Sequence, residues 1–142
     1  MKNTIAFTLL LIAASALAQP GPTYQEAQQK KSGPEFEWDK TEHDFGAIPQ
    51  GDPVTAEYKF KNTGSTPIIL SNVKSTCGCT VPVWPKEPIM PGEEATIKAT
   101  YNAKNPGTFT KRITVVSNAK DNYIYLLLKG KVIAGEGKGD QL

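Results

Sequence analysis

The sequence has few of the residues from which catalytic and metal sites are usually built. Its 142 residues include two cysteines, two methionines and one histidine. That histidine, His43, has no second histidine and no serine nucleophile motif to act with, so we expect a histidine at the edge of a strand rather than a hydrolase site. Zinc is disfavoured because it takes four ligands. Four acidic residues near His43 lack the spacing of a calcium loop and are expected to be solvated charges: Asp39, Glu42, Asp44 and Asp52.

Helical periodicity and an excess of one charge are lacking too. No stretch sustains the apolar spacing of an amphipathic helix. The chain carries 16 basic and 14 acidic side chains, and the two signs are interspersed. Nucleic acids and anionic membranes are recognised by clustered basic residues. We therefore expect neither nucleic acid nor anionic lipid as a partner.

A long apolar run occurs only at the N-terminus. Residues 1–18 begin with Lys2, continue through an apolar stretch and end in A-L-A, which is typical of a signal peptide. The apolar part, residues 5–18, is shorter than the roughly 20 residues that a spanning helix needs. No cysteine lies directly after the expected cleavage point, which disfavours a lipoprotein anchor. We expect an exported protein, periplasmic or extracellular, with no membrane span after cleavage.

The composition divides the rest of the chain into three parts. Residues 19–35 contain one aromatic residue and no aliphatic larger than alanine, too little apolar surface to offset the entropy of ordering. We expect them to form a flexible linker. Residues 134–142, rich in glycine, are expected to be a disordered tail. The folded domain is predicted at residues 36–133.

Alternation of apolar and polar residues predicts strands with one wet face. In residues 54–62, V-T-A-E-Y-K-F-K-N, apolar residues occupy every second position, and residues 94–102 repeat the pattern. Residues 108–117 are rich in β-branched side chains. Residues 122–132 contain the apolar run Y-I-Y-L-L-L. This last strand is predicted to be central in its sheet, because both of its faces are largely apolar.

Shorter segments complete the predicted fold. Residues 67–74 fit a strand, and F-E-W-D and H-D-F-G fit one strand broken by K-T-E at residues 40–42. Turn sequences separate the segments at residues 62–65, 90–93, 105–107 and 118–122. About seven short strands in about 100 residues predict an all-β, immunoglobulin-like antiparallel β-sandwich, with a small barrel as the competing architecture.

Three sequence blocks resemble a known bacterial family. They are D-F-G-A-I-P-Q-G at residues 44–51, Y-K-F-K-N-T-G at residues 58–64, and residues 71–93, which contain C-G-C-T followed by P-I-M-P-G. Over most of residues 36–132 the chain resembles the family called domain of unknown function 1573. The resemblance implies an immunoglobulin-like domain related to those of Hydin and the major sperm protein. It implies a binding or structural module, and no established catalytic activity.

Both cysteines lie in S-T-C-G-C-T-V, where only Gly78 separates Cys77 from Cys79. In a regular strand their Cα atoms would be about 6.5–7 Å apart, at the upper limit for a disulfide. Because Gly78 lacks a Cβ, we expect it to adopt a positive φ and fold the two cysteines into a tight turn. A disulfide formed there closes a very small ring, and we expect it to be reduced more readily than an ordinary structural disulfide.

The residues leave four interpretations of Cys77 and Cys79 open. The pair is a structural staple beside the proline-rich residues 82–91, as thiols or as a local disulfide. Alternatively, it exchanges with the thiols of a partner, although C-x-C differs from the common C-x-x-C redox motif. In a third interpretation it binds a soft ion such as copper(I), with Met90 as a third ligand. In the fourth, one cysteine links to another chain.

The predicted function is that of an exported, non-enzymatic binding or structural module of the cell envelope, without a cofactor. The alternative is a thiol redox or copper-binding protein that acts through Cys77 and Cys79. The expected partner is another protein or an envelope component, bound at a sheet edge or by the loop of residues 75–91. Loop residues predicted to contact it are Thr76, Thr80, Trp84, Pro85 and Pro91. Of these, Trp84 is expected to be more buried than exposed.

Overall fold

The computed structural model describes residues 33–135 and contains eight strands and no helix in them. The expected signal peptide, and most of the expected linker and tail, lie outside these residues. Within the described part of the chain, no helix has the length and apolar character needed to cross a membrane. The strands are β1 (Phe36–Trp38), β2 (Glu42–Pro49), β3 (Val54–Asn62), β4 (Leu70–Ser75), β5 (Thr80–Val83), β6 (Glu94–Tyr101), β7 (Gly107–Ser117) and β8 (Tyr123–Ile133).

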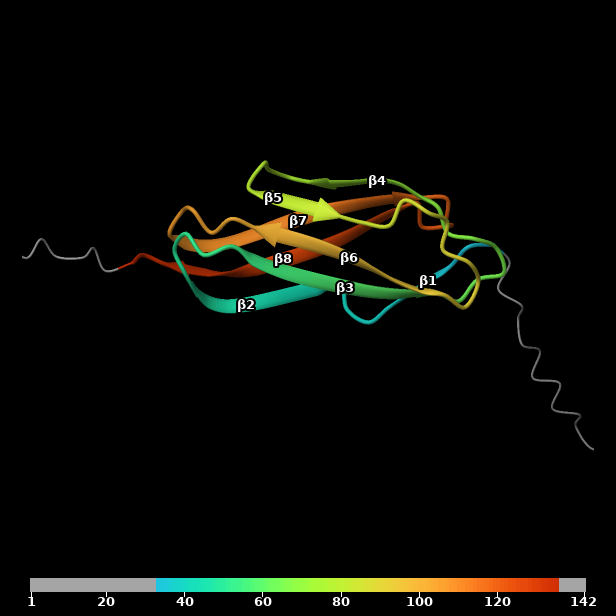
Figure 1. The fold of residues 1–142 in the computed structure, drawn as a ribbon, viewed down its shortest axis with the longest axis horizontal. Helices are drawn as coiled ribbons and strands as arrows, with labels where there is room; N and C mark the ends of the chain where they lie inside the picture. The colour runs from blue at the N-terminus through green and yellow to red at the C-terminus, as the bar shows by residue number, and fades with distance from the viewer. Residues whose placement is uncertain (1–32, 136–142) are drawn as a thin grey trace, which may run out of the picture.

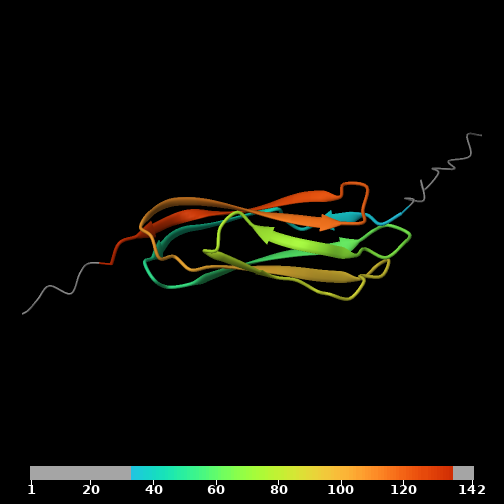
Figure 2. The same ribbon diagram turned by 90° about the horizontal axis from the view of Figure 1, so that it is seen from above.

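The strands form two four-stranded sheets that pack face to face (Figure 1). One sheet has the order β1-β3-β6-β5, and the other has the order β2-β8-β7-β4. Figure 2 shows that the two ends of the described chain lie at opposite ends of the long axis. The predicted all-β, immunoglobulin-like sandwich is confirmed.

Alternation along the strands builds the core between the sheets. In the β3–β6 pair, Tyr58 lies opposite Ile97, and neither side chain has any exposed surface. Burial of a large apolar side chain contributes about 1.5–3 kcal/mol. The Tyr58 hydroxyl donates a hydrogen bond of 2.7 Å to the Leu127 carbonyl in the opposite sheet. Burial, together with the Glu42 carboxylate, raises the pKa of Tyr58, so this hydroxyl keeps its proton and joins the sheets.

The prediction that residues 122–132 form a central strand is confirmed. They correspond to β8, which lies between β2 and β7. Its residues Leu126, Leu128 and Val132 are buried in the core.

The segments F-E-W-D and H-D-F-G form two strands in different sheets, so the prediction of one broken strand is wrong. β1 pairs antiparallel with β3, whereas β2 pairs parallel with β8. The sandwich is therefore not wholly antiparallel, and it has eight strands where about seven are predicted. Alternation shows which side chains face the core, but it does not show which sheet a short strand joins.

Two further boundaries differ from the prediction. β5 is not predicted, since it runs into the proline-rich residues 82–91; it is an edge strand, where the missing N–H of Pro82 is tolerated. The strand predicted at residues 67–74 begins later, as β4. Ahead of β4, Ile68 forms a single antiparallel bridge with Ile89.

The β1 ladder starts earlier than the predicted domain boundary. The Thr63 N–H donates to the Glu35 carbonyl at 3.0 Å, and the Ser65 N–H donates to the Gly33 carbonyl at 2.9 Å. Residues 33–35, the last of the expected linker, thus pair with the turn that follows β3. At the other end, the first residues of the expected tail, Ala134 and Gly135, are exposed.

Candidate functional site

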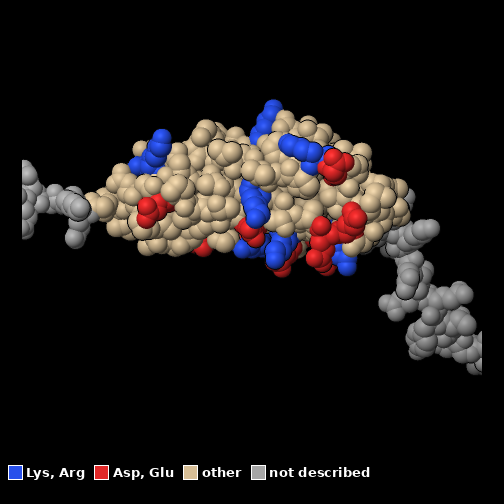
Figure 3. Space-filling model, viewed as in Figure 1, with Lys and Arg blue, Asp and Glu red and all other residues tan. Residues whose placement is uncertain are grey.

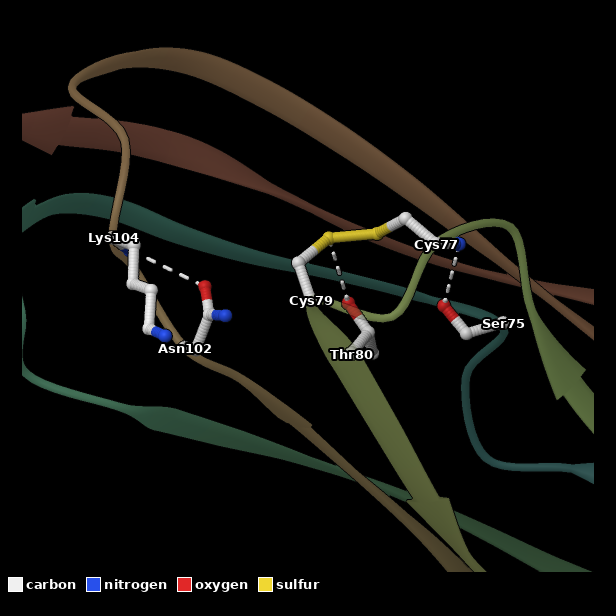
Figure 4. Close-up of a disulfide and its surroundings, with 6 residues drawn as sticks. All are labelled: Ser75, Cys77, Cys79, Thr80, Asn102 and Lys104. Atoms are coloured by element: carbon white, nitrogen blue, oxygen red, sulfur yellow. Dashed lines mark hydrogen bonds between the residues drawn. A yellow bond between two sulfur atoms is a disulfide. The ribbon is translucent and has the colours of Figure 1, made fainter.

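The two cysteines lie where the chain passes from one sheet to the other. β4 is an edge strand of one sheet and β5 is an edge strand of the other. Residues 76–79, here called the disulfide turn, connect them (Figure 4). Cys77 and Cys79 form a disulfide, with their Cα atoms 5.3 Å apart. This distance is shorter than the spacing in a regular strand, so the chain turns between the two cysteines.

Gly78 does not adopt a positive φ, so that expectation is wrong. Among the described residues, positive φ values at glycine occur at Gly33, Gly46, Gly51, Gly92 and Gly107. A Cβ added at Gly78 would meet no atom within 4 Å. The disulfide turn therefore uses backbone conformations open to other residues, and neither its φ nor its surroundings require glycine.

Hydrogen bonds fix the disulfide turn to the strands on both sides. The Thr76 N–H donates to the Arg112 carbonyl of β7 at 3.0 Å, and the Asn102 N–H, just after β6, donates to the Cys79 carbonyl at 3.0 Å. The Ser75 hydroxyl accepts a hydrogen bond of 3.4 Å from the Cys77 N–H (Figure 4). Both cysteines are half-buried, and Cys79 packs against the core. The turn is thus held to both sheets.

The outer edge of β5 offers no free N–H group within the strand. Because Asn102 bonds to Cys79 and directions alternate along an antiparallel ladder, Thr80 and Pro82 turn their backbones away from β6. The Thr80 N–H lies 3.5 Å from the Cys77 carbonyl, and proline has no N–H. An edge without donors resists pairing with another strand, so β5 is protected against strand addition.

The outer face of β5, in contrast, carries exposed apolar side chains. Val81 is 60% exposed and Val83 is 62% exposed. Trp84 follows them, half-buried and packed against the core, with the Lys86 ammonium 2.9 Å from its ring centroid. A cation over an aromatic face is favourable. We call Val81, Val83 and Trp84 the β5 strip.

The other predicted loop residues do not form one surface. Thr76 is exposed and Pro85 is half-buried, but Thr80 is buried at 3% exposure and points into the core. Pro91 lies near Ile89, which pairs with Ile68 ahead of β4, whereas the disulfide follows β4. The length of β4 is about 20 Å. Only part of the predicted loop therefore lies beside the cysteines.

A copper site of Cys77, Cys79 and Met90 is not assembled in the structure. Met90 is separated from the disulfide turn by the length of β4. The two cysteine sulfurs are bonded to each other, whereas metal ligation needs thiolates. Within residues 33–135, no group of three or more His, Cys, Asp or Glu side chains is arranged to hold a metal.

His43 lies in the edge strand β2, as expected, on the opposite edge of the sandwich from the disulfide turn. The Lys40 ammonium is 2.7 Å from its Nδ1, and the Phe45 ring packs against it at 4.4 Å between centroids. Burial of the ring, together with the Lys40 charge, lowers the pKa of His43. The neutral imidazole of His43 accepts a hydrogen bond from Lys40, which is a local structural contact.

Of the β5 strip, the sequence predicts Trp84 as a contact residue but not Val81 or Val83. The signal lies in T-V-P-V at residues 80–83, where Thr80 and Pro82 share one parity and Val81 and Val83 share the other. These residues overlap the proline-rich residues 82–91, where no strand is predicted. The sequence therefore does not predict that Val81 and Val83 lie on the outer face of a strand.

A family model described as "Protein of unknown function (DUF1573)" matches residues 36–132. The chain belongs to this family. The matched residues of the DUF1573 domain run from the start of β1 almost to the end of β8 and include the disulfide turn. A search of curated proteins finds no match to the chain.

Solved structures similar to the DUF1573 chain share its fold at low sequence identity. A protein of unknown function from Porphyromonas gingivalis W83 has a TM-score of 0.63 and 16% identity, over 78% of this chain and 51% of that one. The ASH/PapD-like domain 7 of human CEP192 has a TM-score of 0.61 and 12% identity, over 89% and 100%. The Vibrio cholerae VesB protease has a TM-score of 0.57 and 10% identity, over 68% and 32%.

These likenesses establish an immunoglobulin-like fold of the PapD type and nothing finer. The chain spans about half of the Porphyromonas protein and about a third of the protease. Fold likeness at such identity carries no activity from one protein to another. An immunoglobulin-like domain of unknown function is consistent with a non-enzymatic module.

Proposed function

We propose that the protein is an exported, non-enzymatic immunoglobulin-like module of the cell envelope, periplasmic or extracellular, which binds another protein or an envelope component through the β5 strip. The observation that carries this proposal is the exposure of Val81 and Val83, 60% and 62%, beside a turn held by a disulfide. Apolar side chains that are exposed on a fixed frame lose little entropy when they bind, which favours affinity.

Export is supported by two features. Residues 1–18 have the pattern of a signal peptide, and the Cys77–Cys79 disulfide suits an oxidising compartment. Charge supports a protein partner, because Lys and Arg are mixed with Asp and Glu on the face that Figure 3 shows, with wide uncharged areas between them. The face shown in Figure 3 lacks the basic cluster that nucleic acid needs.

Replacement of both exposed valines is expected to weaken capture of the partner. In a pull-down from the envelope of the source cell, Val81→Ser with Val83→Ser is expected to lower recovery at least about tenfold, because burial of an apolar side chain contributes about 1.5–3 kcal/mol. Ile133→Ser is the matched control, since Ile133 is 46% exposed on β8, outside the strip. Equal recovery with the double variant and the control would show that the β5 strip is not the binding surface.

A second candidate function, thiol exchange, is favoured by the disulfide itself. A partner dithiol would attack one sulfur, pass through a mixed disulfide and leave as a disulfide, while Cys77 and Cys79 become two thiols. The very short loop between the cysteines favours such reduction. The half-burial of both cysteines limits access to the sulfurs.

A variant without the disulfide separates a structural role from an exchange role. Cys77→Ser with Cys79→Ser is expected to lower the free energy of unfolding by about 1.5 kcal/mol, because the cross-link closes only a short loop of the unfolded chain. Urea unfolding measures this loss, and wild-type protein in reductant should show the same value. Rapid oxidation of dithiothreitol by the wild type, and none by the double variant, would instead support thiol exchange.

A further inference from the structure

The edge of the sandwich formed by β1 and β2 is only partly covered. The chain leaves β1 in one sheet and enters β2 in the other, so each strand covers a part of its own sheet edge. The β2–β8 ladder begins at Glu42 opposite Leu127. No described residue pairs with residues 123–126 of β8 on that side. We call these four residues the open half of β8.

The backbone of the open half presents donors and acceptors to the empty position. The Ser117 N–H donates to the Asn122 carbonyl at 3.0 Å, which fixes the alternation in the β7–β8 ladder. Ile124 therefore turns its backbone toward β7, while Tyr123 and Tyr125 turn theirs away. The Leu127 N–H, of the same parity, donates to Thr41 at 2.8 Å at the start of the β2 ladder, in agreement with this assignment.

A groove runs beside the open half, between the two sheets. Its volume is about 510 Å³, and its lining includes Phe36 and Trp38 of β1, Ile124 of β8 and Ala119 of the β7–β8 turn. Figures 1 and 2 both place β1 close to the end of the β7–β8 hairpin. The indole Nε1 of Trp38 is buried and has no hydrogen-bond acceptor among the described residues. A buried donor without an acceptor is costly, so this side of β1 is not fully satisfied by the described residues.

We propose that the open half of β8 binds an extended segment of a partner protein as an added strand in line with β2. Its backbone bonds to Tyr123 and Tyr125, and one apolar side chain enters the groove beside Phe36 and Trp38. Alternating N–H and C=O groups along an edge are complementary to the backbone of an extended peptide. This inference rests on the proposed binding function but uses a surface remote from the β5 strip.

The dimensions of the site favour a single segment over a second copy of this chain. The open half is four residues long and is bounded at one end by Thr41 and β2, and at the other by the β7–β8 turn. β1 stands beside it in the other sheet. Between these limits about four residues of a segment can pair with β8. The groove rim carries Lys120 and Asp121, so the flanking residues of the segment can have either sign.

The edges of β5, β2 and β4 are less suited to strand addition. The β5 edge lacks free donors, as described above. On β2, the Asp44 carboxylate accepts the Gly46 N–H at 2.8 Å, and Pro49 has no N–H. β4 is interrupted between Leu70 and Asn72. Bulges, prolines and locally satisfied donors discourage pairing, and the open half of β8 has none of these features.

Peptide binding to the isotope-labelled protein tests this inference by NMR. The probe is the capped peptide Lys-Val-Thr-Val-Lys-Val-Thr, and its control is the same peptide N-methylated at alternate residues, which keeps the side chains but removes backbone donors. We expect the unmodified peptide to shift the amide signals of Tyr123 and Tyr125 and the indole signal of Trp38. The methylated peptide is expected to bind at least about tenfold more weakly.

Two variants at one position test the role of the Tyr125 N–H. Tyr125→Pro removes a donor that faces the open edge and so leaves the β7 ladder intact, whereas Tyr125→Ser keeps the donor and removes the ring. We expect the first to lose binding and the second to keep it. The amide spectrum of each variant reports whether it folds, and the methylated peptide tests the wild type if Tyr125→Pro does not fold.

Three outcomes would overturn the inference: no shift at Tyr123, Tyr125 or Trp38 with the unmodified peptide, equal affinity of the methylated peptide, or dimerisation by light scattering that involves the same amides. If the peptide does not bind but substitution of the valines abolishes capture from the envelope, the strand-addition inference is rejected and the proposed function stands. If the peptide binds but substitution of the valines does not change capture, the β5 strip is rejected as the binding surface and the strand-addition inference stands.

Discussion

Asn62→Ala is expected to lower the free energy of unfolding by about 3 kcal/mol. Asn62 has no exposed surface, at the end of β3. Its Nδ2 donates to the carbonyls of Thr66 at 2.8 Å and Ile89 at 2.9 Å, and its Oδ1 accepts the Gly64 N–H at 2.9 Å. Alanine would leave two carbonyls and one N–H without this partner, the Ile89 carbonyl in a buried position and the other two groups in part-buried ones. Each unpaired group costs about 1–3 kcal/mol, and a hydrogen bond to water reduces this cost.

Asn118→Ala is the matched control for this prediction. Asn118 also bridges two backbone groups, because its Oδ1 accepts the Ile69 N–H at 2.8 Å and its Nδ2 donates to the Pro67 carbonyl at 3.1 Å. It is exposed, so water can replace it, and we expect a loss of about 1 kcal/mol or less. Urea unfolding measures both losses of stability, provided that the free energy of unfolding falls with urea concentration at the same slope in the two variants. Equal losses for the two variants would show that burial does not decide the cost.

Asn62 also shows which part of the fold the sequence predicts. It occupies the parity of Ala56, Tyr58 and Phe60, which are buried as alternation predicts. A polar residue at that parity signals a buried hydrogen-bonded group, since unpaired polar groups are costly in a core. Its three partners, however, come from the turn after β3 and from the bridge segment at Ile89. Local pattern predicts the burial, but the partners depend on how distant segments meet.

The candidate site divides in the same way. The sequence locates Cys77 and Cys79 in a connection between strands, and limits a disulfide between them to a turned backbone. It does not place Met90 at the far end of β4, because that position depends on the bridge between Ile68 and Ile89. The open half of β8 exists because β1 and β2 join different sheets. Strand assignment of this kind is non-local, and no periodicity along the chain encodes it.

Gly64→Ala is expected to detach the start of the β1 ladder and to lower stability by about 2–4 kcal/mol. Gly64 lies in the turn after β3, where a Cβ would overlap the Gly33 carbonyl oxygen and come within 2.6 Å of the Glu35 nitrogen. Both neighbours are backbone atoms, which cannot move aside without breaking the hydrogen bonds of their segment. Those bonds are Thr63 N–H to Glu35 at 3.0 Å, Ser65 N–H to Gly33 at 2.9 Å, and Gly33 N–H to the Ser65 hydroxyl at 3.1 Å.

Hydrogen exchange distinguishes local detachment from global loss. In Gly64→Ala, the amides of Thr63 and Ser65 should exchange much faster than in the wild type, while those of β7 should change only with the global free energy. Gly78→Ala is the matched control, because its Cβ would meet nothing within 4 Å. We expect it to change stability by less than about 1 kcal/mol. Phe36 and Trp38 follow the detached residues and line the groove, so Gly64→Ala should also weaken binding of the peptide probe. Unchanged hydrogen exchange at Thr63 and Ser65 would contradict the steric argument.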